Sequence, residues 1–304
     1  MNDYHLFGWR LRSQLSLVEL LPWRGDARAP DIIVEIGTVP ELDPESPCFS
    51  PVLQIQPTGV RFIIPSVAGY WVEGGRRVVV SPTLPKEAPD IRVFLLGTVL
   101  AVLCFQRGLL PLHASAVDIG GQTLLLSGPS GAGKSTLAAA FSARGHRLLS
   151  DDLCALRIEK GESLMIHPAF PIVKLWRDSA DHLQAPIDGL PRSREELEKY
   201  HVPLAEDRFQ PAPLPVAQIV FLRTERLAEA RRSRLLGGFE ALRRYDLVHR
   251  WRLGLALGAH RLMFEGMARL VETASVAEVA RSADLADLPS LVDEVLALMD
   301  APGE

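Results

Sequence analysis

The sequence has few cysteines, no excess of positive charge and no long apolar run among its 304 residues. The three cysteines, Cys48, Cys104 and Cys154, match no metal-binding spacing, so we expect reduced thiols and a cytoplasmic protein. A net charge of −4 argues against a nucleic-acid-binding protein, because such proteins are usually basic. The longest apolar run, 93–105, is too short to span a bilayer. It predicts a buried helix and no membrane partner.

Three further absences narrow the class of protein. The first residues, MNDYHLFGW, lack a basic segment followed by an apolar core, so we expect no signal peptide. The N-K-x-D motif that reads guanine in GTPases is absent, and so is the L-S-G-G-Q motif of ABC-type ATPases. These absences argue against a GTPase and against a transport ATPase.

In one stretch, 122–152, almost every residue fits a recognisable structural or functional pattern. Residues 128–135 read GPSGAGKS, which matches the phosphate-binding pattern G-x-x-x-x-G-K-S without a departure. The apolar run 124–126 predicts a buried strand before it, and residues 136–141, mostly good helix formers, predict a helix after it. We therefore expect a phosphate-binding loop. Its residues are Gly128, Pro129, Ser130, Gly131, Ala132, Gly133, Lys134, Ser135 and Thr136.

The residue types in this loop fit nucleotide chemistry. Backbone N–H groups must turn inward to hold phosphate oxygens, and glycine adopts the required dihedrals without strain. The helix that begins near Lys134 adds its free N–H groups and the positive end of its dipole. We expect Lys134 to reach the β- and γ-phosphates of ATP and Ser135 to ligate Mg²⁺.

Two adjacent carboxylates, Asp151 and Asp152, end the next predicted strand, 146–150. A phosphate-binding loop needs a carboxylate at the end of a neighbouring strand to hold Mg²⁺. One aspartate would then ligate the metal while the other accepts a proton from an attacking hydroxyl. The pattern does not say which does which, and a solvated turn is the alternative interpretation.

The surrounding residues resemble a known family. His113-Ala-Ser-Ala-Val, then the loop, then RGHRLLSDD (144–152) follow one another as in the C-terminal domain of HPr kinase/phosphorylase, over about 110–157. Weaker similarity continues at 168–176 and 213–222, where the patterns resemble HPr-kinase-like proteins found beside peptide-modification genes, including kinases of lasso precursor peptides. The glycine-rich signature and basic loop that follow the DD pair in true HPr kinases are absent here.

This resemblance implies a fold and a reaction. It implies an α/β P-loop kinase domain of the type shared by HPr kinase and phosphoenolpyruvate carboxykinase, which uses ATP and Mg²⁺ and assembles as a homo-oligomer. It implies a serine acceptor in a peptide or small protein, and a place for His113 near the site; a structural role is the alternative for this histidine. Because the signature is absent, the resemblance does not imply that HPr is the substrate of this protein or that it performs the reverse phosphorylase reaction.

The rest of the chain suggests two domains. Residues 1–90 predict a small, mainly β domain with strands at 6–11, 31–36, 60–64 and 70–72 and a hairpin into 76–81. An open sheet edge there is a candidate for substrate recognition. We expect a connecting helix at 91–107 and the catalytic domain at 108–304. Within that domain we expect a strand at 112–119, a loop at 178–191, a charged helix at 192–200 and a terminal helix at 285–299.

Phosphoryl transfer also needs positive charge beyond the loop lysine. Lys174 and Arg177 are candidates, although solvated surface residues are the alternative. Four arginines in a predicted helical stretch are further candidates, and the sequence does not choose among them. They are Arg243, Arg244, Arg250 and Arg252.

The leading hypothesis is a Mg²⁺-dependent kinase that transfers the γ-phosphate of ATP to a serine of a peptide, for which a biosynthetic precursor peptide is the expected source, or of a small protein. Lys134, Asp151, Asp152 and His113 would form its catalytic centre, and Ser135, Asp151 and Asp152 its metal site. A kinase of small molecules such as amino acids, or a P-loop ATPase that drives a partner, remains as the alternative.

Overall fold

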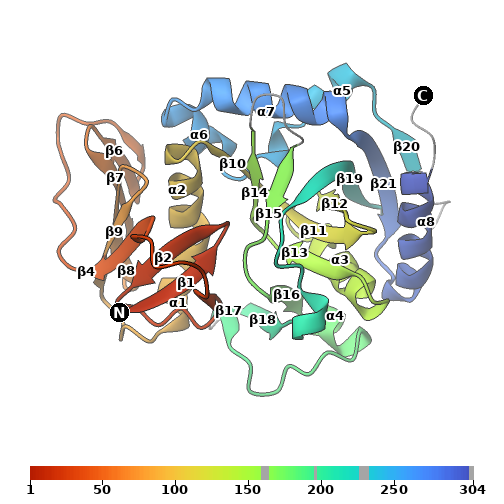
Figure 1. Cartoon of the computed structure of the whole chain (residues 1–304), viewed down its shortest axis with the longest axis horizontal. Helices are drawn as coiled ribbons and strands as arrows, with labels where there is room; N and C mark the ends of the chain where they lie inside the picture. Colours follow the sequence, from red (N-terminus) through yellow and green to blue (C-terminus); the bar gives the residue numbers. More distant parts are fainter. Residues whose placement is uncertain (159–163, 195–196, 226–232, 301–304) are drawn as a thin grey trace.

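The computed structural model describes residues 1–158, 164–194, 197–225 and 233–300. Within these residues the protein is a mixed α/β structure with three sheets. Figure 1 shows a β-rich N-terminal part at the left, a helix-covered sheet at the right and a small third sheet at the bottom. Residues 160–162, whose Lys-Gly-Glu sequence predicts a turn, and the basic residues at 226, 231 and 232, which are candidates for phosphate or peptide binding or for a solvated stretch, lie outside the described residues.

Residues 2–82 form the first sheet, as the alternating N-terminal segments predict. Its strands are β1 (Asn2–Leu6), β2 (Trp9–Ser13), β3 (Leu21–Pro22), β4 (Ile32–Ile36), β5 (Cys48–Ser50), β6 (Leu53–Gln56), β7 (Gly59–Ile64), β8 (Ala68–Glu73) and β9 (Arg77–Pro82). They lie in the order β3-β1-β2-β4-β9-β8-β7-β6-β5, so β3 and β5 are the edges. The β8–β9 hairpin is confirmed, with Glu73 opposite Arg77 and positive φ at Gly74 and Gly75.

The prediction of a strand at 6–11 is wrong, because the chain reverses direction within these residues. Phe7 and Gly8 have φ values of 52° and 80°, and the chain reverses there to pair β1 with β2. A two-residue turn with both φ values positive matches the twist of an antiparallel hairpin. The pattern hid this turn because Phe7 is itself fully buried, so the apolar run continues through the reversal.

A continuous helical segment, Pro89–Gln106, follows the first sheet. It consists of α1 (Pro89–Phe94), one π-helical stretch, η1 (Leu95–Val99), and α2 (Leu100–Gln106). By length and composition alone these 18 residues would suffice to cross a membrane, but 67% of the segment is buried inside the molecule. Most of its apolar side chains pack into the same core as the first sheet, so the predicted buried helix is confirmed.

The second sheet carries the phosphate-binding loop. Its strands are β10 (Leu109–Leu112), β11 (Ala114–Ile119), β12 (Gln122–Ser127), β13 (Arg147–Ser150), β14 (Cys154–Arg157), β15 (Met165–His167), β19 (Leu214–Glu225), β20 (Ser233–Leu235) and β21 (Ser275–Ser282). Strand β12 lies between antiparallel β11 and parallel β19. Leu125 packs on one face of the sheet while Leu124 and Leu126 pack on the other, which explains the unbroken apolar run.

Helices cover both faces of this sheet (Figure 1). The helices are α3 (Lys134–Ala143), α5 (Gly238–Leu242), α6 (Trp251–Ala256), α7 (His260–Thr273) and α8 (Leu288–Asp300), with short 3-10 turns at Glu206–Arg208, Tyr245–Leu247 and Leu285–Asp287. Helices α3 and α8 contribute to one core, and α5 and α7 contribute to the other. The terminal helix expected at 285–299 is confirmed.

A third sheet corrects one expectation. Its strands, in the order β16-β18-β17, are β16 (Ile172–Trp176), β18 (Leu197–Pro203) and β17 (Arg192–Arg194). The charged helix expected at 192–200 is therefore wrong. Residues 197–202 include Glu and Lys, which favour helices, but pairing with β16 buries Tyr200 and Val202 instead.

The loop expected at 178–191 is partly wrong. Residues 178–182 belong to helix α4 (Arg177–His182), and the loop starts only after them.

Candidate active site

The loop between β12 and α3 has the backbone that the glycine pattern predicts. Gly128, Gly131 and Gly133 have φ values of 140°, 83° and 94°, which side chains disfavour. A Cβ atom at Gly128 would lie 2.5 Å from the carbonyl oxygen of Leu222. Gly133 ends the loop and leads into α3. The sequence therefore places glycine where the chain bends out of β12 and again where the helix begins.

Lys134 opens α3, and its side chain folds back over the loop. Its Nζ donates hydrogen bonds to the carbonyl oxygens of Gly128, at 2.8 Å, and Pro129, at 3.2 Å. The residue is only 7% exposed, and this burial lowers the pKa of the ammonium group, while the charges of Asp152 and Asp151 oppose the shift. The lysine is thus a cation held at the loop by weak carbonyl partners, which anionic phosphate oxygens would readily replace.

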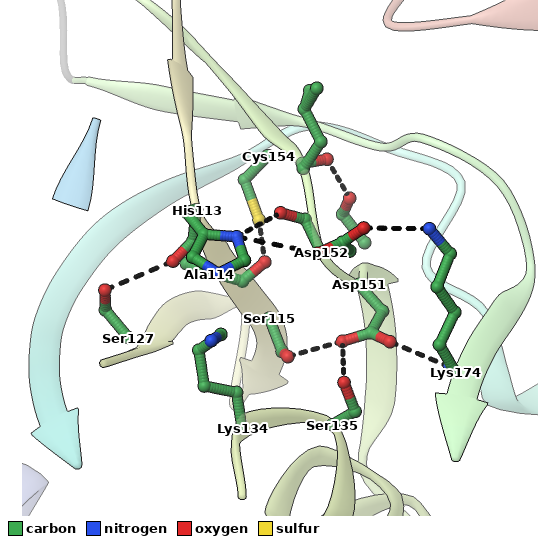
Figure 2. A network of polar contacts seen from close by, with 12 residues as sticks. His113, Ala114, Ser115, Ser127, Lys134, Ser135, Asp151, Asp152, Cys154 and Lys174 are labelled. Carbon is green, nitrogen blue, oxygen red and sulfur yellow. Dashed lines mark hydrogen bonds and ion pairs between the residues drawn. The ribbon is translucent and has the colours of Figure 1, made fainter. Parts of the chain in front are cut away.

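Asp151 is held by three donors from three different elements (Figure 2). Its Oδ1 accepts hydrogen bonds from the hydroxyls of Ser115, at 2.6 Å, and Ser135, at 2.9 Å. Its Oδ2 accepts one from the backbone N–H of Lys174 at 2.8 Å. The residue is 3% exposed, so the carboxylate is fixed against the first turn of α3. The structure thereby brings together two of the three predicted metal ligands, Ser135 and Asp151.

Asp152 points elsewhere, into the neighbouring cavity. Its Oδ2 lies 2.8 Å from the Nζ of Lys174, and its Oδ1 lies 3.5 Å from the Nδ1 of His113. Attraction to Lys174 is the main reason why the pKa of the Asp152 carboxyl lies well below its usual range; burial opposes this shift and His113 assists it. Asp152 has a φ of 74°, a left-handed backbone conformation. Adjacent aspartates thus serve two separate sets of partners.

His113 sits at a bend between β10 and β11 rather than inside the single strand expected at 112–119. Its Nδ1 lies 3.1 Å from the carbonyl oxygen of Asp152, which can only accept, so Nδ1 carries a proton. Burial lowers the pKa of this imidazole, and the charge of Lys134 lowers it further. The histidine therefore contacts the DD pair, and it holds the backbone of Asp152 in place.

A cavity of about 750 Å³ opens in front of these groups. Its walls include Ser130, Gly131, Gly133, Lys134, Ser135, Thr136, His113, Asp152 and Lys174. Among the other predicted residues, Gly128, Pro129 and Ala132 shape the loop behind this wall, and Asp151 stands behind Ser135. Among the described residues that line it, five carry a cationic side chain and four a carboxylate, so the chamber beside the glycine loop has the size and the excess of positive charge to receive a nucleoside triphosphate.

The other basic candidates divide between this cavity and the rest of the molecule. Lys174 and Arg177, which the sequence offered as candidates, line the cavity. Arg244 instead pairs with Glu278 and Asp246. Neither Arg250 nor Arg252 lines this cavity; both line a different one.

Two contributors were missed by the sequence analysis. Arg281, on β21, lines the cavity and donates from Nε to the carbonyl oxygen of Ala132 at 2.6 Å. No local pattern announces it, because β21 lies far along the chain. Ser115 could have been found, since it follows His113 by two residues and a strand returns to the same face every second residue.

The donor set fits a magnesium ion. The Ser135 hydroxyl and the Asp151 carboxylate are hard oxygen donors that already touch, and Mg²⁺ prefers such ligands. Among the described residues there is no group of three or more His, Cys, Asp or Glu side chains able to hold a metal ion. Mg²⁺ usually takes one or two protein ligands and completes its shell with water and phosphate oxygens, so two ligands are sufficient.

Comparison with known proteins gives a local similarity. A segment of 55 residues, 18% of the chain, is 47% identical to 16% of the HPr kinase/phosphorylase of Chlorobium limicola. A segment of 54 residues is 44% identical to the same enzyme from Treponema pallidum, covering 18% of this chain and 17% of that protein. The match therefore spans about a sixth of the length of these curated relatives.

Beyond that segment the similarity is slight. No known protein-family model matches the chain. The solved structure of the Hpr(Ser) kinase/phosphatase from Coxiella burnetii aligns with 62% of this chain and 90% of that chain, at 15% identity and a TM-score of 0.32. The chain is thus similar to HPr kinase/phosphorylases over one segment.

Proposed function

We propose that this protein is a Mg²⁺-dependent kinase of the cytoplasm that transfers the γ-phosphate of ATP to a serine hydroxyl of a peptide or small protein. In this proposal residues 108–304 form a P-loop kinase domain of the HPr-kinase and phosphoenolpyruvate-carboxykinase-like type. Residues 1–90 serve substrate recognition, and 91–107 connect the two. The local similarity to HPr kinase/phosphorylases and the composition of the cavity support this assignment.

The loop and its lysine bind the triphosphate. Backbone N–H groups of residues 128–133 and the beginning of α3 hold the phosphate oxygens. Lys134 exchanges its carbonyl partners for β- and γ-phosphate oxygens. Ser135 and Asp151 hold Mg²⁺, which neutralises charge on the phosphates when bound. Arg281 keeps the loop in shape through the carbonyl oxygen of Ala132.

Asp152 acts as the proton acceptor. It lines the cavity, whereas Asp151 already accepts three hydrogen bonds and is 3% exposed. The serine oxygen forms a bond to the γ-phosphorus while the bond from that phosphorus to the ADP oxygen breaks, and the hydroxyl proton passes to Asp152. With its pKa lowered by Lys174, Asp152 is ionised at neutral pH but is a weak base. It therefore takes the proton late, once the serine oxygen has become acidic.

One observation carries this proposal. Ser135 of the phosphate-binding loop touches Asp151, while the next residue, Asp152, opens onto the same cavity as Lys134. A binding module needs only the loop, and an ATPase needs only to orient water. A second, separately held carboxylate beside the γ-phosphate position is what transfer to a hydroxyl requires.

The test is mass spectrometry after incubation with Mg-ATP and the short peptides encoded beside the gene. We expect one added phosphate on a serine, lost in Lys134→Ala and kept in Lys86→Ala, whose side chain is exposed. ATP turnover with no phosphorylated peptide would favour a small-molecule acceptor or a switch ATPase. Absence of both ATP binding and turnover would overturn the proposal.

A further inference from the structure

A second cavity, of about 590 Å³, lies between the β5 end of the N-terminal sheet and helix α6. Its floor is apolar: Phe49 of β5, Leu53 of β6 and Phe62 of β7 line one side. Thr98 of the connecting helix, Arg250 and Trp251 line the other. In Figure 1 α6 and α2 lie beside the end of the first sheet that carries β6 and β7. The nucleotide cavity shares none of these lining residues.

Two backbone irregularities shape this cavity. Thr98 belongs to the π-helical stretch Leu95–Val99, and such stretches inside helices occur frequently at functional sites. Arg250 has a φ of 56°, a left-handed conformation that residues other than glycine rarely adopt. Each places a side chain in the cavity wall. Two strained or irregular segments, far apart in sequence, thus meet at one cavity.

The cavity also carries unbalanced positive charge. Arg250 and Arg252 both line it and both are exposed, and among the described residues neither has a carboxylate partner. Arg252 lies over the ring of Trp251, with 5.2 Å from its guanidinium carbon to the ring centroid. The chain as a whole has a net charge of −4, so this local excess is not a general property of its surface. The apolar floor and the cationic rim of this cavity are complementary to a ligand in which carboxylates flank an apolar side chain.

A short path joins this cavity to the active site. Arg250 follows His249, whose ring centroid lies 5.5 Å from that of His113 in the wall of the nucleotide cavity. Two backbone hydrogen bonds fix this junction: His249 donates to Pro111, and His113 donates to Leu247. The wall of the second cavity is thus joined to the wall of the nucleotide cavity through Arg250, His249 and His113. Strand β5 is an edge of the first sheet, beside which an extended chain can lie, and the ring of Phe49 on it is exposed.

We propose that the second cavity binds the acceptor peptide outside its serine, through a bulky apolar residue seated between Phe49 and Trp251 and flanking Asp or Glu residues held by Arg250 and Arg252. This inference rests on the proposed function and deepens it. It assigns recognition of an acidic, apolar segment to a surface shared by the N-terminal sheet and α6.

The test measures binding without ATP. The probes are two fluorescein-labelled peptides, Gly-Glu-Glu-Phe-Glu-Gly-Ser-Gly and a counterpart with Lys in place of each Glu. We expect the acidic peptide to bind the full chain, and Arg250→Glu with Arg252→Glu to weaken it at least tenfold. The charge-reversed protein should in turn prefer the lysine peptide. Arg243→Glu, which changes an exposed arginine outside the cavity, should leave both affinities unchanged.

A second variant tests the apolar floor. Phe49→Ala removes a ring that is 41% exposed, so folding is retained, and the acidic peptide should again bind at least tenfold more weakly. Unchanged affinity in both variants, or no binding of the acidic peptide at millimolar concentration, overturns the inference. Self-association in sedimentation that is lost in the arginine variant, with peptide affinity unchanged, assigns the surface to a second copy and also overturns it.

Different results would contradict the proposed kinase activity and the proposed peptide-binding cavity. Peptide bound at this cavity and never phosphorylated would contradict the kinase while the binding site stands. Phosphate transfer with the same KM for peptide in wild-type and variant proteins would contradict the binding site while the kinase stands. In the expected case the variants raise the peptide KM at least tenfold, and kcat and the affinity for ATP stay unchanged.

Discussion

Lys174 holds both aspartates of the DD pair. Its backbone N–H donates to the Asp151 carboxylate at 2.8 Å, and its ammonium group lies 2.8 Å from the Asp152 carboxylate. One residue of β16 therefore sets the position of the proposed metal ligand through its main chain and the charge of the proposed base through its side chain. The two functions can be separated by substitution, because a side-chain change leaves the N–H in place.

Replacing Lys174 by Met should shift the pH dependence of phosphate transfer. Attraction to Lys174 is the largest cause of the lowered pKa of the Asp152 carboxyl, so this pKa should rise in the variant. Since Asp152 must be ionised to accept a proton, the acid limb of kcat/KM should move to higher pH. Transfer measured across the range of about pH 4–8 checks this. An acid limb that does not move would separate Asp152 from the proton transfer; Lys86→Met is the control.

The same substitution should change stability in a pH-dependent way. The folded-state pKa of Asp152 lies below the value of about 3.9 for an unfolded chain. Its ionisation therefore stabilises the fold above that pH, and the contribution is lost as the pH falls through the folded-state pKa. We expect the wild-type advantage over Lys174→Met in urea denaturation to be present at neutral pH and to shrink at strongly acidic pH.

Asp151→Asn and Asp152→Asn should each reduce transfer by at least about 10², for different reasons. Asp151→Asn weakens the link to Ser135, so it should also raise the Mg²⁺ concentration needed for half-maximal activity. Asp152→Asn should leave that concentration and ATP binding close to wild type, because its side chain contacts Lys174 and His113 instead. Mg²⁺ titrations of both variants make the comparison. Full transfer in both would remove the pair from the mechanism.

The part of the site predicted from sequence is the part built by local chain geometry. The loop lies between one strand and one helix that are adjacent in sequence, so eight consecutive residues determine it. The DD pair follows within the same stretch of chain. The position of Arg281 depends on how β21 pairs in the sheet, and pairing between distant strands leaves no spacing signal in one sequence.

The fold was predicted least well where composition and pairing disagree. Residues 197–200 read as a helix by their Leu, Glu and Lys content, yet they pair with β16, and that pairing places Lys174 opposite His201. The reversal at Phe7 was missed because a buried aromatic residue occupies a position that usually needs a turn former. In both places tertiary packing outweighs local preference.

Alanine substitutions in the loop should form a graded series. Gly131→Ala meets nothing within 4 Å at a φ of 83°, so only the left-handed backbone opposes it, at about 1–2 kcal/mol. Gly133→Ala places a Cβ 2.7 Å from the Arg281 guanidinium, which can move only by leaving the carbonyl oxygen of Ala132. Gly128→Ala meets the backbone of Leu222, which cannot move aside.

Thermal denaturation should therefore rank the loss of stability as Gly128→Ala largest, Gly133→Ala next and Gly131→Ala smallest. The affinity for ATP should fall in Gly133→Ala more than in Gly131→Ala, because only the former displaces Arg281. Equal losses of stability at all three positions would show that backbone strain alone determines the effect and that the contacts of the added Cβ atoms do not contribute.

A buried ion pair ties the N-terminal part to the connecting helix. Arg92 of α1 donates from Nε to both carboxylate oxygens of Glu19, at 2.8 Å and 3.0 Å. The two side chains are 9% and 3% exposed. Removing one partner strands a buried charge, which typically costs about 3–5 kcal/mol, so Glu19→Ala should lower the free energy of unfolding by about that amount.

Removing both partners should cost less than removing one. Glu19→Leu combined with Arg92→Met leaves no buried charge and fills similar space, so this double variant should recover most of the stability lost in Glu19→Ala. Glu87→Ala is the matched control, because Glu87 contacts Arg92 only through its backbone carbonyl and its side chain is 71% exposed. Urea denaturation of the four proteins makes the comparison. A double variant as unstable as Glu19→Ala would mean that the pair holds α1 against the first sheet by its specific hydrogen bonds, and that apolar packing cannot replace them.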